Sequence, residues 1–357
     1  MYNGGMNMYN YKISVTADWH WGCKDDNKLF YEEFPLYMQH LREDKPDAII
    51  ICGDWYHRIL KLTESPSKYS FNAMYQLNEY SINHKVPLII LKGTKTHDNN
   101  QLNNLARINN PYFKIINTVT EDILLPGLKV LYVPEEYIED GYYDKYFNVE
   151  EHYYDIIFGH GMFDFAGFNK DSKERQLKNA PTFKSNLFDR ISRVTLFGHV
   201  HNRQQKGNVY YIGSYSANSF DEIGDRGWIL LNITDDEHEV EYKNNEKAPK
   251  YITVNIDKIE GETDIEKMSV INQIREDYDY IRIISNSKDA EGLKALTAST
   301  NIKVQVKQQT ETKQVPEEYR FVLDDTIDLD EKIKRYAKLQ YGIDLDKEFI
   351  QTNIKEE

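Results

Sequence analysis

Five short apolar runs in this chain each stop at Gly, Asp or His, and this recurrence limits the fold more than any other feature. The last run, Val194–Phe197, ends at Gly198 and is followed by His199 and His201. Side chains two residues apart on an extended backbone point to the same side, so both imidazoles can face one cleft. Taken alone, these two histidines are also consistent with a polar turn.

Four earlier runs repeat the pattern, at Tyr11–Thr16, Ala48–Cys52, Val86–Leu91 and Asp155–Phe158. The polar or glycine residues that follow them are Asp18 and His20; Gly53, Asp54 and His57; Gly93, His97 and Asp98; and Gly159 and His160. In an open α/β sheet, ligands bind outside the carboxyl ends of the strands. We therefore predict that these strand ends converge on one site.

The segments between the first runs have helical periodicity. Apolar residues in Leu29–Arg42 and in Tyr69–Asn83 recur about every 3.6 residues. This alternation predicts mostly parallel strands with crossover helices on the sheet faces. Later runs are expected to form a second sheet packed on the first, namely Lys129–Val133, Asp155–Phe158, Val194–Phe197, Val209–Ile212 and Trp228–Ile233. The predicted fold class is α/β, a two-sheet sandwich flanked by helices.

The length of 357 residues exceeds the roughly 250–300 that one hydrophobic core supports, so more than one domain is expected. The charged stretch 235–250 is interpreted as a hairpin and linker. Beyond it, three apolar runs and a helix near Lys288–Thr297 predict a small α+β capping domain. The predicted division is a flexible lead-in at 1–10, the two-sheet domain at 11–248, the capping domain at 249–312 and a helical tail at 313–357.

The tail contains a helix with clear ends. Asp328 and Glu331 resemble a capping box, and Gly342 is expected to end the helix. A second helix is predicted in Asp344–Ile350. Two interpretations stay open: this helical pair packs on its own domain, or it binds a partner protein.

Composition excludes some classes of protein. The net charge of −14 argues against binding nucleic acid through bulk electrostatics, which needs clustered Lys and Arg. Bound cations or a partner can still supply local positive charge.

Only Cys23 and Cys52 are cysteines, which favours a reducing cytoplasm. No apolar run approaches the ~18 residues that a membrane span needs, and the N-terminal stretch lacks the order of a signal peptide.

The candidate site combines carboxylate and imidazole groups, which suit Mn, Fe or Zn better than Mg or Ca. One aspartate between two ions would make a two-metal site that clamps both oxygens of a phosphate ester. The chain contains, in this order, the motifs D-x-H, G-D, H-D after a Gly, G-H and G-H-x-H. This series resembles the motifs of the calcineurin-like metallophosphoesterase superfamily. Within it, G-D-x-x-H at Gly53–His57 and the stretch Val209–Leu231 resemble SbcD-type DNA exonuclease subunits, and phage recombination endonuclease subunits in particular.

The resemblance implies a role for each motif residue. Asp18, His20 and His201 would hold one metal ion and Asp54 would bridge. His160 and His199 would hold the second ion. His97 would protonate the leaving 3′ oxygen, and His57 would position the phosphate.

One motif departs from the family pattern. In the family, the asparagine directly before the H-D pair ligates the second metal. When that pair is matched to His97 and Asp98, Thr96 takes the place of the asparagine, and Thr94 and Lys95 are two extra residues between it and Gly93. A neutral hydroxyl is a poorer ligand than an amide oxygen. Whether Thr96 is a ligand, or whether water, Asn99 or Asn100 replaces it, stays open.

The resemblance also implies a function and partners. We expect a metal-dependent DNA nuclease with 3′→5′ exonuclease and endonuclease activity in DNA repair and recombination. Two divalent ions are expected, Mn²⁺ in the first instance and Mg²⁺ as the alternative. The expected partners are DNA, an SbcC-type coiled-coil ATPase and a second copy of the chain, in the cytoplasm, or the host cytoplasm for a phage-encoded chain. The alternatives are a stand-alone phosphodiesterase or phosphatase, and a metal-poor interaction scaffold.

Trp19 and Trp21 flank the first motif. They could stack on unpaired bases, but packing in the core beside the metal loop is the favoured interpretation.

Overall fold

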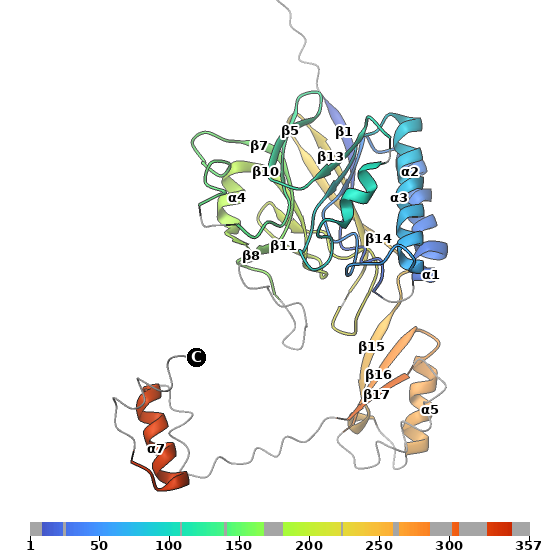
Figure 1. Cartoon of the computed structure of the whole chain (residues 1–357). Coiled ribbons are helices and arrows are strands. Elements are labelled where there is room, and N and C mark those ends of the chain that lie inside the picture. The colour runs from blue at the N-terminus through green and yellow to red at the C-terminus, as the bar shows by residue number, and fades with distance from the viewer. Residues whose placement is uncertain are drawn as a thin grey trace, which may run out of the picture.

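Two six-stranded sheets packed face to face form the larger part of the molecule (Figure 1). The structure is a computed structural model that describes residues 9–23, 26–107, 109–138, 141–167, 181–222, 224–259, 264–285, 302–306 and 327–344. The predicted two-sheet α/β sandwich is confirmed.

The first sheet has the order β14-β13-β1-β2-β3-β4. Its strands are β1 (Asn10–Thr16), β2 (Ala48–Ile51), β3 (Leu88–Leu91), β4 (Phe113–Ile116), β13 (Gly227–Thr234) and β14 (His238–Asn244). Strands β1 to β4 are parallel, and β13 runs antiparallel to both β1 and β14. The carboxyl ends of β1, β2 and β3 therefore lie at one edge of the sandwich.

The second sheet has the order β11-β12-β10-β7-β6-β5. Its strands are β5 (Thr120–Leu125), β6 (Leu128–Val133), β7 (Tyr154–His160), β10 (Ser192–Gly198), β11 (Gln204–Lys206) and β12 (Val209–Tyr211). Strands β6, β7, β10 and β12 are parallel. The assignment of Trp228–Ile233 to this sheet was wrong. That run lies in β13 of the first sheet, because it pairs with β1 from Asn10↔Thr234 to Val15↔Ile229.

Helices cover the outer faces of the two sheets, α2 and α3 on one side and α4 on the other (Figure 1). Alternation along β2 explains the layers: Ile49 and Ile51 pack against the helices, while Ala48 and Ile50 face the second sheet. The helical segments are α1 (Asp26–Lys28), the π-helical turn η1 (Leu29–Glu33), α2 (Phe34–Asp44), α3 (Ser65–His84), the 3₁₀ helix η2 (Gln101–Arg107) and α4 (Ser185–Ile191). A two-stranded sheet pairs β8 (Met162–Phe163) with β9 (Thr182–Phe183).

A smaller unit follows the β13–β14 hairpin. It has a parallel three-stranded sheet in the order β15-β16-β17, with a core that includes Ile256, Ile271 and Ile281. Its elements are β15 (Tyr251–Asn255), the 3₁₀ helix η3 (Ile256–Lys258), α5 (Asp264–Ile274), β16 (Tyr280–Ser285) and β17 (Ile302–Val306). The predicted helix at Lys288–Thr297 lies outside the described residues, and the boundaries 249–312 stay a prediction.

The tail contains α7 (Leu329–Tyr341). Asp328 caps it, because its Oδ1 accepts the Glu331 N–H at 3.0 Å, and Gly342 ends it with φ of 69°. Both predicted ends of this helix are confirmed. The second tail helix, predicted in Asp344–Ile350, lies almost wholly outside the described residues, as does most of the lead-in. Within the described ranges, no helix combines the length and the apolar character needed to cross a membrane.

Candidate metal centre

The strand ends of both sheets meet at one edge of the sandwich. Asp18 and His20 follow β1, Asp54 follows β2, and His160 ends β7. His199 and His201 follow β10. The backbones approach closely there: a Cβ at Gly53 would lie 2.3 Å from the His160 ring, so only glycine fits.

The six residues form two clusters. In the first cluster, Asp18, His20 and His201 bring their ligand atoms within 4.8 Å of one another. In the second cluster, Asp54, His160 and His199 do the same. Asp54 Oδ2 lies 3.4 Å from His160 Nε2 and 3.8 Å from His20 Nε2, so its carboxylate faces both clusters.

The backbone is held in an unfavourable conformation at four of these residues. The φ angles are 53° at Asp18 and at His20, 50° at Asp54 and 89° at His199. Such conformations cost about 1–3 kcal/mol each and persist only where the surroundings fix them. The His199 N–H, for example, donates to both carboxylate oxygens of Asp18, at 3.2 and 3.1 Å. Strain gathered at one polar edge is typical of a functional site.

Hydrogen bonds to the far ring nitrogens orient two of the histidines. His160 Nδ1 donates to the Cys52 carbonyl at 2.8 Å, and His201 Nδ1 lies 2.9 Å from Glu222 Oε1. In a neutral ring this leaves Nε2 with a lone pair that faces the cluster. Lone pairs and carboxylates that face one another repel unless a cation lies among them. The donor set therefore fits divalent metal ions.

The charges of the buried carboxylates lead to the same conclusion. Burial raises the pKa of Asp18 to about 6. Burial also opposes ionisation of Asp54, but His160 and His97 outweigh it and hold the pKa of Asp54 well below its usual range. Burial lowers the pKa of His160, yet Asp54 outweighs it and the pKa rises to about 10. Without a metal ion, the buried carboxylates thus hold a proton on the His160 ring, and a divalent ion bound by the deprotonated ring would supply that positive charge instead.

His57 and His97 lie beside His20, and one nitrogen of each of the three rings falls within 4.8 Å of the others. His97 Nδ1 lies 2.7 Å from Asp54 Oδ2. Burial lowers the pKa of His97, but the Asp54 carboxylate outweighs it and the pKa is raised. Burial and the neighbouring His97 instead lower the pKa of His57 to about 4. The two imidazoles are thereby suited to different tasks.

Thr94, and not Thr96, lies in the centre, which revises the sequence alignment. Thr96 is exposed, whereas the Thr94 hydroxyl lies 3.2 Å from Asp54 Oδ2 and 3.4 Å from His160 Nε2. The reason is a tight turn after β3, in which the N–H groups of His97 and Asp98 both donate to the Thr94 carbonyl. This turn directs the intervening residues outward. Asn99 and Asn100, the other two replacements considered, are exposed as well.

Sequence reasoning missed Glu135. It is 1% exposed, and its Oε2 lies 3.1 Å from His199 Nδ1 and 3.6 Å from His160 Nε2. Burial opposes its ionisation, but His199 outweighs burial and lowers the pKa of Glu135. The signal was present, because Glu135 follows the apolar run of β6 just as the other site residues follow theirs. Only Gly, Asp and His were considered as the residues that follow an apolar run, so this glutamate was overlooked.

The two tryptophans beside the first motif are core residues, so the base-stacking interpretation was wrong. Trp19 and Trp21 are both fully buried. The Trp19 ring stacks on Tyr215 with centroids 3.9 Å apart, and both indoles contact Trp55.

The calcineurin-like phosphoesterase family matches residues 11–203 of this sequence. The match contains every residue of both clusters. The chain belongs to this family. Its resemblance to SbcD-type subunits is confirmed as well, and the family makes it a phosphoester hydrolase that binds divalent metal ions.

Similar proteins include the SbcD subunit of the nuclease SbcCD from Staphylococcus epidermidis, which is 26% identical over 265 residues. That alignment covers 62% of this chain and 66% of the relative, just under two thirds of its length. Among solved structures, the phosphoesterase YfcE of E. coli is 14% identical with a TM-score of 0.30, covering 64% of this chain and 91% of that one.

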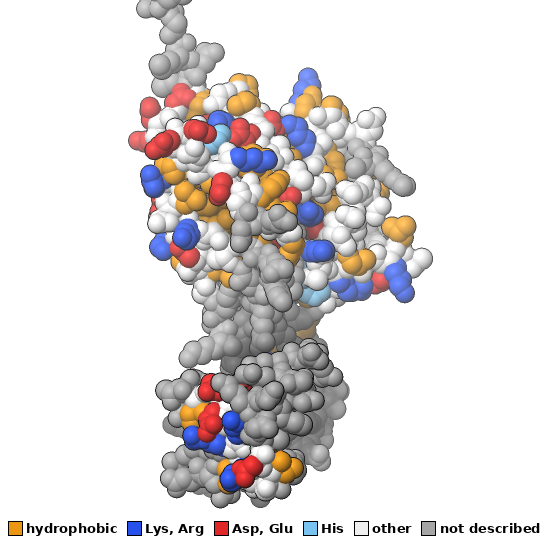
Figure 2. All heavy atoms as spheres, turned by 60° about the vertical axis from the view of Figure 1, so that its left-hand side comes forward, with side chains coloured by type: hydrophobic (Ala, Val, Ile, Leu, Met, Phe, Trp, Pro, Cys, Tyr) orange, Lys and Arg blue, Asp and Glu red, His pale blue; other side chains and the backbone are white. Residues whose placement is uncertain are grey.

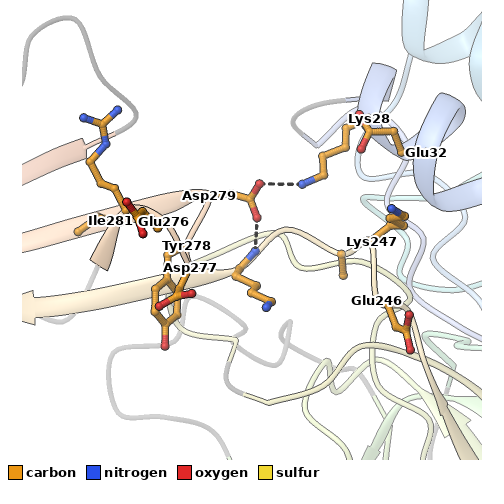
Figure 3. A pocket seen from close by; sticks show the side chains of 12 residues that line it. Lys28, Glu32, Glu246, Lys247, Glu276, Asp277, Tyr278, Asp279 and Ile281 are labelled. Carbon is orange, nitrogen blue, oxygen red and sulfur yellow. Dashed lines mark hydrogen bonds and ion pairs between the residues drawn. The ribbon is translucent and has the colours of Figure 1, made fainter. Parts of the chain in front are cut away.

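A cavity of about 400 Å³ lies where the smaller unit meets η1 of the phosphoesterase domain (Figure 3). Asp279 stands at its centre, 2.9 Å from Lys28 Nζ and 2.8 Å from the Lys250 N–H. Acidic and basic side chains line it together and partly neutralise one another. Arg282 makes a second link, 3.1 Å from Asp221. This cavity marks a junction between the two units.

Proposed function

We propose that this chain is a metal-dependent DNA nuclease of the SbcD type that hydrolyses phosphodiester bonds with two divalent ions, Mn²⁺ or alternatively Mg²⁺. The observation that carries the proposal is the pair of clusters on either side of the Asp54 carboxylate. Asp18, His20 and His201 would hold one ion, Asp54 would bridge, and His160 and His199 would hold the other. The similarity to the SbcD subunit of a nuclease supports DNA as the substrate.

The protein side chains divide the remaining chemistry. Bound ions would lower the pKa of a water and neutralise the charge of the phosphate. His97 would protonate the leaving 3′ oxygen, and its raised pKa favours the charged ring that this step requires. His57, whose pKa is about 4, stays neutral and positions a phosphate oxygen by a hydrogen bond.

DNA would reach the centre past the smaller unit. Tyr251 and Tyr280 of that unit border a cavity of about 20 Å³ that His20 also lines. The smaller unit would therefore cap the DNA-binding side of the first cluster. On the face seen in Figure 2, acidic and basic side chains are interspersed, and acidic ones gather at the upper left. This charge pattern is consistent with metal ions and a partner supplying most of the attraction for DNA.

An SbcC-type coiled-coil ATPase is the proposed partner, with two copies of this chain in the complex. The tail helix α7 suits that role, because Leu339 is 49% exposed and Ile343, just beyond the helix, is 52% exposed. Apolar side chains on one exposed helical segment are what a helix-in-groove contact requires.

Digestion of a 3′-labelled DNA duplex with Mn²⁺, Mg²⁺ or EDTA tests the proposal. We expect Mn²⁺-dependent release of the 3′ label as a mononucleotide by the wild-type chain and none by Asp18→Ala. A chain that hydrolyses bis-p-nitrophenyl phosphate but cuts no DNA, even with an SbcC-type partner and ATP, would instead be a stand-alone phosphodiesterase. A chain that binds no metal and cleaves neither substrate would be an interaction scaffold.

A further inference from the structure

We propose that Glu135 is a ligand of the second metal ion and replaces the asparagine that other members of the family supply. The proposal rests on the two-metal centre described above and deepens it. It assigns a role to a buried carboxylate that none of the sequence motifs contains.

The need for another ligand arises at Thr94. Its main-chain N–H donates to Asp54 Oδ1 at 2.6 Å, and its hydroxyl lies among Asp54, His160 and His199. Thr94 thus lies within the second cluster but brings only a neutral hydroxyl. The second cluster by itself then offers one carboxylate and two imidazoles.

Glu135 is held so that one of its oxygens faces this cluster. Tyr137 donates its hydroxyl hydrogen to Oε1. The Glu135 N–H donates to the Lys92 carbonyl at 3.1 Å, which ties the end of β6 to the end of β3 in the other sheet. The other carboxylate oxygen, Oε2, is the atom that lies near His199, His160 and the Thr94 hydroxyl.

Two of the three separations match those of atoms that share an ion, and the third, to His160, is slightly longer. Two ligands bound about 2.1 Å from one metal at 90–110° lie roughly 3.0–3.4 Å apart. Glu135 Oε2 lies 3.1 Å from His199 Nδ1, 3.3 Å from Thr94 Oγ1 and 3.6 Å from His160 Nε2. A fully buried carboxylate in such surroundings also needs a cationic partner.

A different role for Glu135 is to orient His199 by accepting a hydrogen bond. The two roles differ in what a glutamine would do. Glutamine at position 135 keeps an oxygen that accepts a hydrogen bond, so it would preserve the orienting role, but it removes the charged ligand.

The test is calorimetric titration of the EDTA-treated full chain with MnCl₂. For the wild type we expect two ions per chain. In Glu135→Gln the weaker site should lose roughly 10- to 100-fold in affinity, while the site of Asp18, His20 and His201 should change less than about threefold. Glu136→Gln is the matched control, because the adjacent Glu136 is also buried but accepts the Val119 N–H at 3.1 Å.

A rescue variant makes the test specific. Thr94→Asn in the Glu135→Gln background restores an amide oxygen beside the second cluster and should recover most of the lost affinity. Melting temperatures measured in EDTA would verify that each variant is folded.

Two results would overturn the proposal. They are an unchanged second site in Glu135→Gln, which together with loss in Glu135→Ala would indicate the orienting role, and a wild-type chain that binds a single ion. Failure of the nuclease proposal looks different, because a chain that binds two ions through Glu135 but cuts no DNA contradicts only the function.

Discussion

The two clusters of the metal centre are built from the same kind of strand end, yet they differ in what completes them. Asp18, His20 and His201 all belong to motifs of the family, and Glu222 supports His201 from behind. The second cluster has its two motif histidines and Asp54, but its threonine departs from the pattern. A carboxylate from the end of β6 stands next to it instead.

This difference teaches how such a centre can tolerate change. Its side chains come from the ends of strands in two sheets, so a neighbouring strand end can supply a ligand that another has lost. The first cluster lacks this freedom, because its members come from only two strand ends, those of β1 and β10. We expect substitutions to separate the clusters accordingly.

Asp54→Asn should have the largest effect because it alone faces both clusters. We expect affinity for both ions to fall and Mn²⁺-dependent DNA cleavage to drop by roughly 10³-fold or more. Metal analysis and a kinetic assay on the same sample check this. Asp122→Asn, on the far edge strand β5, is the control, and loss at one site only would show that Asp54 does not bridge.

His97→Ala should come next, with chemistry impaired and both ions retained. Without an acid for the leaving oxygen, DNA cleavage should fall by about 10²- to 10³-fold. In the wild type the cleavage rate should fall as pH rises through the raised pKa of His97. The pH–rate profile of the variant should lack this fall. Bis-p-nitrophenyl phosphate, whose leaving group needs no proton, should be cleaved almost normally by the variant. An equal loss on both substrates would contradict the acid role.

Glu222→Gln should weaken the first cluster alone. Burial opposes ionisation of Glu222, but His201 outweighs it and lowers the pKa of Glu222. Glutamine removes the charge that strengthens His201 as a ligand, so affinity for the first ion should fall about 10-fold with the second unchanged. Glu135→Gln should have the opposite effect, with affinity for the second ion lowered and affinity for the first ion nearly unchanged. Glu241→Gln, on exposed β14, should leave both sites unaltered.

Glu33→Gln should change stability and leave cleavage within about twofold. Burial raises the pKa of Glu33 from 4.5 to about 7, against hydrogen bonds from Ser216 and Asn245. Between these pH values the folded chain retains a proton that the unfolded chain has lost. The wild type should therefore lose about 3 kcal/mol of unfolding free energy as pH rises from 4.5 to 8, and the variant should not. Chemical denaturation across that range measures the difference, and parallel curves would contradict it.

The sequence by itself determined the sandwich and the six residues that meet in the two clusters. Apolar runs that end in Gly, Asp or His are local patterns, and parallel strands bring their ends together whatever lies between. It also determined the ends of α7, because a cap needs only the residues within one turn.

Only the tertiary structure decided the rest. It put β13 into the first sheet, since strand pairing depends on partners far away in the chain. It buried Trp19 and Trp21 and turned Thr96 outward. It also brought Glu135 beside His199, 64 residues away, a proximity that no spacing in the sequence encodes because it depends on how β6 and β10 lie beside β7.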